Sequence, residues 1–111
     1  MKLIFAIVQD EDASRLVNNL MKEGFSVTKL ATTGGFLRSG NTTLLLGVDD
    51  EKLSAAMSVI EHVCRSRKQM ASAPMTTPDS TSVYGAANFP VEVTVGGATV
   101  FVMTVDQFVK L

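Results

Sequence analysis

Two stretches with helical periodicity, each introduced by acidic residues, constrain the fold of this chain more than any other feature. Acidic residues 10–12 and 49–51 each precede a series of apolar residues spaced three and four apart. Carboxylates favour the first turn of a helix because they complement its unpaired amides and its dipole. The spacing therefore predicts two amphipathic helices, the first closed by Gly24 and the second running to about Arg67. A divalent metal at residues 10–12 is the alternative to helix capping.

Short apolar runs surround the two predicted helices. Five of them have the β-branched and aliphatic composition of strands: Lys2–Val8, Phe25–Thr32, Thr42–Val48, Val91–Val95 and Thr99–Thr104. We expect the second and third strands to pair antiparallel. The last two flank Gly96-Gly97, a dipeptide typical of two-residue turns, so we expect them to form a hairpin.

The first six elements of the order β-α-β-β-α-β-β match the split βαβ, or ferredoxin-like, pattern. This pattern predicts an α+β fold, in which an antiparallel sheet carries two helices on one face and a C-terminal hairpin strand is added. Strands that are almost continuously apolar indicate that both sheet faces are buried. We therefore expect subunits to pack sheet against sheet in a closed homo-oligomer, and a trimer would form three equivalent clefts.

Length and composition narrow the classes of partner. The chain has 111 residues, which predicts a single domain over residues 1–111. Its net charge of −1 argues against a nucleic acid polymer as partner. Its apolar runs are far shorter than the roughly 20 residues of a membrane span, so we expect no membrane partner. The single cysteine, Cys64, fits a small buried hydrophobe, and a cytoplasmic location suits a chain without an internal disulfide.

The stretch from Val27 to Gly47 has the composition of a binding loop held between two strands. Residues 33–41 carry three glycines, one arginine and one asparagine around a Phe-Leu pair. Gly34-Gly35 can adopt positive φ and expose backbone amides to a ligand, and Asn41 offers the paired donor and acceptor that suit an adenine edge. A simple turn is the alternative. No Gly-Lys-Ser/Thr follows, so this is not a Walker phosphate loop.

Residues 69–90 have no periodicity and are rich in Ser, Thr, Ala, Pro and Met. This composition predicts a long flexible loop. A connection of this length inside a compact domain is typical of either a functional lid or a linker.

The chain also carries four long motifs: A-I-V-Q-D, V-T-K-L-A-T-T-G-G-F-L-R-S-G-N-T-T, L-L-G-V-D-D and V-E-V-x-V-G-G-A-T-V-F-V. Together they resemble the PII-like cyclic di-AMP receptor family over nearly the whole chain. The resemblance implies a bacterial signal-transduction protein without catalytic activity or cofactor. It implies a homotrimer that binds the second messenger cyclic di-AMP at subunit interfaces and regulates a downstream protein, which stays unknown. Residues 33–41 and 69–90 match the short and long loops by which this family differs from nitrogen-regulatory PII proteins.

The resemblance also implies a set of ligand contacts by position: Thr28, Gly35, Phe36, Leu37, Asn41, Gly47 and Phe101. Asn41 is expected to read an adenine edge, and Gly47 to leave room for the base. Phe36 and Leu37 would cover the base, while Thr28 and loop amides meet phosphate or ribose.

Three further candidates are Ser26, Arg38 and Lys110. Compared with the family pattern, Ser26 replaces a long basic residue and Lys110 replaces a glutamine. Arg38 and Lys110 are the cations available to compensate for the lost positive charge.

The leading hypothesis is a receptor in which the ligand orders residues 33–41 and 69–90 and so changes the surface offered to a partner. A small ferredoxin-like enzyme would need a nucleophile with a base or a carboxylate pair in a cleft, yet the aspartate pairs lie at predicted helix starts. A trimeric metal-responsive protein would need a His/Cys cluster, and the only histidine, His62, lies off the apolar stripe. We therefore expect neither catalytic residues nor metal ligands.

Overall fold

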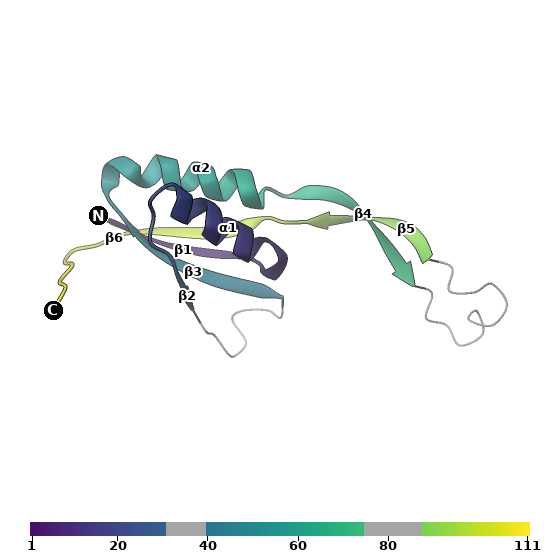
Figure 1. Cartoon of the computed structure of the whole chain (residues 1–111), viewed down its shortest axis with the longest axis horizontal. Helices are drawn as coiled ribbons and strands as arrows, with labels where there is room; N and C mark the ends of the chain where they lie inside the picture. Colours follow the sequence, from purple (N-terminus) through teal and green to yellow (C-terminus); the bar gives the residue numbers. More distant parts are fainter. Residues whose placement is uncertain (31–39, 75–87) are drawn as a thin grey trace. The chain divides into compact units, whose positions relative to one another are not determined.

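The computed structural model describes residues 1–30, 40–74 and 88–111 of the chain, which is drawn in Figure 1. The chain divides into two compact units. The first comprises Met1–Arg65 and Gly96–Leu111, and the second is Ser66–Val95. The chain therefore passes between the units twice, once after Arg65 and once before Gly96.

A four-stranded antiparallel sheet of order β2-β3-β1-β6 forms the frame of the first unit. Its strands are β1 (Lys2–Gln9), β2 (Thr28–Leu30), β3 (Asn41–Val48) and β6 (Ala98–Thr104). The pairing of β2 with β3 confirms the predicted antiparallel neighbours, although β2 is shorter than the predicted run and Phe25–Val27 precedes it without strand pairing. β1 lies at the centre, between β3 and β6.

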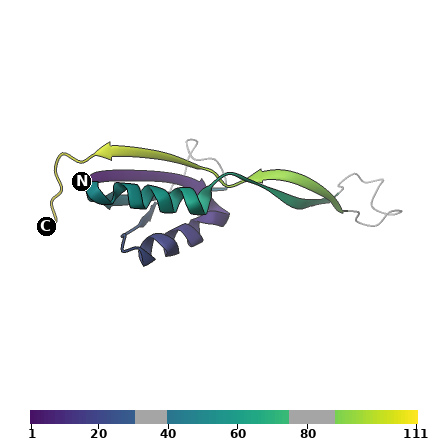
Figure 2. The same ribbon diagram turned by 90° about the horizontal axis from the view of Figure 1, so that it is seen from above.

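Two helices cover one face of this sheet, as Figure 2 shows: α1 (Asp10–Lys22) and α2 (Leu53–Cys64). A 3-10 turn, η1 (Asp50–Lys52), leads into α2. Alternate strand residues and the apolar stripes of both helices meet in the core, because the periods of two and 3.6 residues place them on facing surfaces. The fully buried members of this core include Ile4, Ala6, Leu16, Leu20, Leu44, Ala56 and Ile60. The predicted α+β fold with two helices on one sheet face is thus confirmed.

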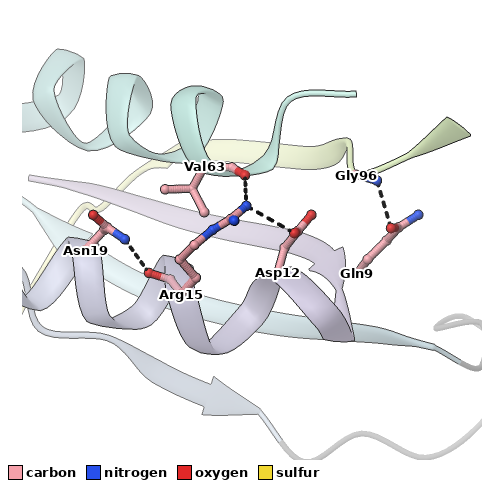
Figure 3. Close-up of polar contacts among 6 residues, drawn as sticks. All are labelled: Gln9, Asp12, Arg15, Asn19, Val63 and Gly96. Atoms are coloured by element: carbon pink, nitrogen blue, oxygen red, sulfur yellow. Dashed lines mark hydrogen bonds and ion pairs between the residues drawn. The ribbon is translucent and has the colours of Figure 1, made fainter. Parts of the chain in front are cut away.

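The predicted start of the first helix is also confirmed, whereas the second acidic cluster lies in and just before η1, ahead of α2. Asp10, Glu11 and Asp12 occupy the first turn of α1, and Gly24 follows its last turn with a φ of 89°. Arg15 then ties the two helices together, as Figure 3 shows. Its Nη2 donates a hydrogen bond of 2.8 Å to the carbonyl oxygen of Val63 and lies 3.4 Å from Oδ1 of Asp12.

The predicted end of the second helix at Arg67 is wrong. α2 ends at Cys64, where its apolar stripe also ends, and Arg65 adopts an extended backbone with a ψ of 141°. Arg67 and Lys68 begin a strand instead of closing the helix. Basic residues suit a helix C-terminus, but they do not set its position.

The second unit is a two-stranded antiparallel ribbon of β4 (Arg67–Pro74) and β5 (Asn88–Val95). The prediction of a flexible loop over residues 69–90 is therefore wrong for residues 69–74 and 88–90, which are strand, while residues 75–87 lie outside the described part. Backbone pairing alone defines these strands, and it requires no apolar periodicity. Lys68 Nζ and Glu92 Oε1 form an ion pair of 3.1 Å across the ribbon.

The predicted hairpin around Gly96-Gly97 is wrong as well. Both glycines have the positive φ of a tight turn, 84° and 91°, yet the flanking strands do not pair with each other. β5 pairs with β4, and β6 pairs with β1. The fourth strand of the core sheet is therefore Ala98–Thr104 and not Val91–Val95. The two glycines follow the second unit in sequence and lead into β6.

We predict that Arg15→Ala lowers the free energy of unfolding by about 1 to 2 kcal/mol. The variant loses a hydrogen bond from a charged donor, whereas the half-exposed pair with Asp12 adds little. The measurement is urea unfolding at pH 7. Lys22→Ala, which removes another exposed cation from α1, is the control and should change stability by less than about 0.5 kcal/mol. Equal losses in both variants would contradict the proposed bridge.

Candidate functional site

The face of the four-stranded sheet opposite the helices carries the predicted contact residues that the structure describes. Directly paired residues of antiparallel strands point to the same side of a sheet, so the register identifies the members of this open face. They are Leu3, Phe5, Ile7, Gln9, Thr28, Leu30, Asn41, Thr43, Leu45, Gly47, Thr99, Phe101 and Met103. Thr28, Asn41, Gly47 and Phe101, predicted from separate motifs, thus share one surface.

The centre of the open face is apolar. Leu3, Phe5 and Leu45 are half-buried there, while Phe101 and Met103 remain 49% and 44% exposed. A contiguous apolar surface of this kind is typical of an interaction site. The polar members of the face, mainly threonines and amides, lie around this centre.

The predicted contacts are spread widely over the open face. Thr28 and Phe101 stand at opposite edges of one row, which runs from β2 through Leu45 and Phe5 to β6. Three strand spacings separate them by about 14 Å. Asn41 and Gly47 lie near opposite ends of β3, roughly 20 Å apart along the strand. A single base therefore cannot contact all four residues of one chain.

Asn41 lies at a corner where several hydrogen bonds hold the backbone. It begins β3 directly opposite Gln9, at the point where β1 runs into α1. The amide of Asp10 donates to the carbonyl oxygen of Gly40 at 2.8 Å, and the Asp10 carboxylate accepts a short hydrogen bond from the Thr42 hydroxyl. The residues on both sides of Asn41 are thus tied to Asp10. These bonds fix the start of β3, where the Asn41 side chain is half-buried.

Among the described residues, nothing requires glycine at position 47. Gly47 is exposed, and within this part of the chain a Cβ added to it would meet only Sδ of Met1, at an ordinary contact distance of 3.9 Å. Its φ also lies outside the left-handed range that favours glycine. A glycine that neither the backbone nor the local packing requires is consistent with close approach by another molecule.

Several predicted site residues are not brought to the open face by the structure. Gly35, Phe36, Leu37 and Arg38 lie outside the described residues, so their contacts stay predictions. Ser26 is exposed just before β2, and Lys110 is exposed in the segment that follows β6. Neither belongs to the paired registers that define the open face.

Three of the four aspartates at the predicted helix starts have polar or charged partners within the first unit. Asp10 accepts from Thr42, and Asp12 faces Arg15. Asp50 lies 2.9 Å from the Met1 ammonium, and the hydrogen bond and positive charge of that group lower the pKa of Asp50. These contacts explain the acidic clusters at the helix starts without a catalytic role.

Sites of other kinds find no support in the described residues. No cluster of three His, Cys, Asp or Glu residues that could hold a metal occurs among residues 1–30, 40–74 and 88–111. Over the same residues, no helix has the length and apolar character to cross a membrane. His62 is exposed and Cys64 is buried, as the sequence predicts for both side chains.

Sequence reasoning missed the roles of Gln9 and Asp10. The sequence predicts helix capping, or a metal, for Asp10, whereas the structure shows that Asp10 also anchors the start of β3. Gln9 was not singled out, although its Oε1 accepts a hydrogen bond from the Gly96 amide at 2.8 Å. Their position directly after an apolar run, in the motif A-I-V-Q-D, is the signal that could have pointed to them.

Comparison with known proteins gives two results. The sequence profile of the family described as "Cyclic-di-AMP receptor" matches residues 1–111. The crystal structure of a functionally unknown protein from Pediococcus pentosaceus is similar to this chain, with a TM-score of 0.76 and 39% sequence identity. That similarity covers 99% of this chain and 96% of the Pediococcus protein.

Proposed function

The chain belongs to the cyclic di-AMP receptor family, and from this premise we propose that it binds cyclic di-AMP on the open face, between two copies of the chain. One observation carries the proposal. Thr28, Asn41, Gly47 and Phe101, which the family resemblance implies as ligand contacts, fall on the same face of one sheet by their register. The proposed activity is recognition, and it requires no catalytic group.

The spacing on the open face favours a site shared between copies. Thr28 and Phe101 of one chain are about 14 Å apart, and the apolar residues Phe5 and Leu45 lie between them. A second copy on this face would bury the apolar centre and supply its own Phe101 to the β2 edge of the first. Cyclic symmetry repeats such a cleft at every interface, and a homotrimer has three of them.

The side chains offer a chemical basis for selecting adenine. The amide of Asn41 can donate to N7 and accept from N6 of adenine, whereas guanine presents two acceptors on the same edge. Phe101 can stack on a base, and Gly47 leaves room for it. The Thr28 hydroxyl can donate to a phosphate oxygen, with Gly35, Phe36 and Leu37 as further contacts. The site should therefore prefer cyclic di-AMP to cyclic di-GMP.

The output of the receptor would be a change in the surface offered to a partner protein. A ligand shifts such an equilibrium only if it contacts the two conformations differently. The ligand contacts proposed for residues 35–37 meet this condition for the segment 33–41. We extend the proposal to Gly96, which follows the ribbon of β4 and β5 in sequence, because its amide donates to Gln9, the direct partner of Asn41.

We predict that Asn41→Ala weakens cyclic di-AMP binding by about 1 to 3 kcal/mol, because it removes the paired hydrogen bonds to adenine. Isothermal titration at fixed salt measures the change. Asn18→Ala removes an exposed asparagine on α1, in the helical layer, and is the matched control that should bind as the wild type does.

Two negative results of this titration lead to different conclusions. Unchanged affinity in Asn41→Ala would remove that residue from the site while leaving the receptor function standing. No binding of cyclic di-AMP by the wild-type protein would overturn the function.

We further predict that Met103→Glu dissociates the oligomer, whereas Val102→Glu leaves it assembled. The two residues are neighbours on β6 and are similarly exposed, at 44% and 42%, but only Met103 lies on the open face. A carboxylate buried without a partner at the interface costs several kcal/mol. Light scattering after gel filtration should give the 11.9 kDa of a single chain for Met103→Glu. Oligomers of equal mass in both variants would contradict sheet-to-sheet assembly.

A further inference from the structure

The Gln9 side chain connects the Asn41 corner with the point where the chain returns from the second unit to the first. Its Oε1 accepts the hydrogen bond from the Gly96 amide, at 2.8 Å, as Figure 3 shows. Gln9 is also the direct partner of Asn41 in the pairing of β1 with β3. The Cβ atoms of such a pair lie about 4.5 to 5.5 Å apart on one face. A single side chain therefore lies beside Asn41 and holds the junction.

At the junction, hydrogen bonds determine the path of the backbone through Gly96 and Gly97. The second unit ends at Val95, and Gly96 and Gly97 follow with φ values of 84° and 91°. Two consecutive glycines have wide conformational freedom, so their own torsions fix the path only weakly. The Gly97 amide donates to the backbone carbonyl of Cys64, whereas the Gly96 amide donates to a side chain. A side chain can change rotamer, so the Gly96 bond is the adjustable one.

The other end of the Gln9 amide is available for a ligand. A glutamine side chain has one acceptor oxygen and two N–H donors. The oxygen is used by Gly96, and within the part of the chain that the structure describes Nε2 donates to no group. Gln9 is half-buried and directly paired with Asn41, so its side chain leaves the sheet on the same face as Asn41, within reach of a ligand bound there.

We propose that Gln9 is a positioning residue that couples nucleotide binding at Asn41 to the junction of the β4–β5 ribbon. This inference rests on the proposed function. A nucleotide seated on Asn41 accepts a hydrogen bond from Gln9 Nε2, which fixes the rotamer that holds Oε1 on Gly96. Coupling between two sites is reciprocal, so a held junction also strengthens nucleotide binding.

Two substitutions distinguish the role of the Gln9 acceptor oxygen from that of its N–H donors. Gln9→Glu keeps an acceptor for the Gly96 amide but has no N–H donors for a nucleotide. Gln9→Ala removes both. Asn19→Ala is the matched control, since it also removes a hydrogen bond between a side-chain amide and the backbone, the 2.7 Å bond in which Nδ2 donates to the carbonyl oxygen of Arg15. Figure 3 shows this bond on α1.

The experiment measures amide hydrogen exchange of Gly96 by NMR, with and without saturating cyclic di-AMP, alongside titration calorimetry. Gly97 is an internal reference in every sample, because its bond to Cys64 does not involve Gln9. We expect Gln9→Ala to speed exchange of Gly96 about fivefold to tenfold and to change Gly97 less than about twofold. Gln9→Glu should keep Gly96 slow and weaken cyclic di-AMP binding about tenfold.

The ligand response completes the test. In the wild type and in Asn19→Ala, cyclic di-AMP should slow Gly96 exchange by about fivefold, and both Gln9 variants should lose this response. A ligand-induced slowing that persists in Gln9→Ala, or a Gly96 exchange rate unchanged by that substitution, would overturn the coupling. If the wild type does not bind cyclic di-AMP, the proposed function itself is overturned. Calorimetry measures this binding separately from the exchange rates, so the two failures are distinguishable.

Discussion

The structure depends on how β1 divides its apolar residues between the two faces of the sheet. Ile4, Ala6 and Val8 point into the core against the helices, while Leu3, Phe5 and Ile7 lie on the open face. β1 is the central strand, so this alternation sets the character of both faces. The two helices bury the apolar side chains of one face. The other exposes apolar side chains that a second copy can cover.

The central position of β1 also organises the candidate site. Its C-terminal residue Gln9 and the following Asp10 meet the start of β3 on one side and the return of the chain at Gly96 on the other. The proposed contact Asn41 and Gly96, the first residue after the ribbon, thus both adjoin Gln9. In our proposal, the ligand contact and the backbone that responds to the ligand are close together because both adjoin the C-terminal end of β1.

Patterns local in sequence were sufficient to predict the helices and most of the core sheet. Acidic residues and apolar stripes located α1 and the start of the second helical segment, and apolar runs of strand length located β1 and β3. Pairing between distant segments was not predictable in the same way. Gly96-Gly97 has the expected torsions, but whether β6 pairs with β5 or with β1 depends on non-local packing. The small and polar residues of β4 carry no periodic signal.

For the site, the sequence supplied the residues and the structure supplied their arrangement. The family resemblance named Thr28, Asn41, Gly47 and Phe101, and the register brought them to one face. Only the register revealed that Thr28 and Phe101 occupy opposite edges, which favours a shared cleft. Gln9 was not predicted because its role depends on a contact with Gly96, far along the chain.

The most direct test of a shared cleft is to titrate mixed oligomers with cyclic di-AMP. Asn41→Ala and Phe101→Ala chains, each weak alone, are assembled together in equal amounts. If each cleft combines Asn41 of one copy with Phe101 of its neighbour, about one quarter of the clefts are intact and bind with wild-type affinity. A mixture that recovers no wild-type clefts would contradict the account and place the whole site within one chain.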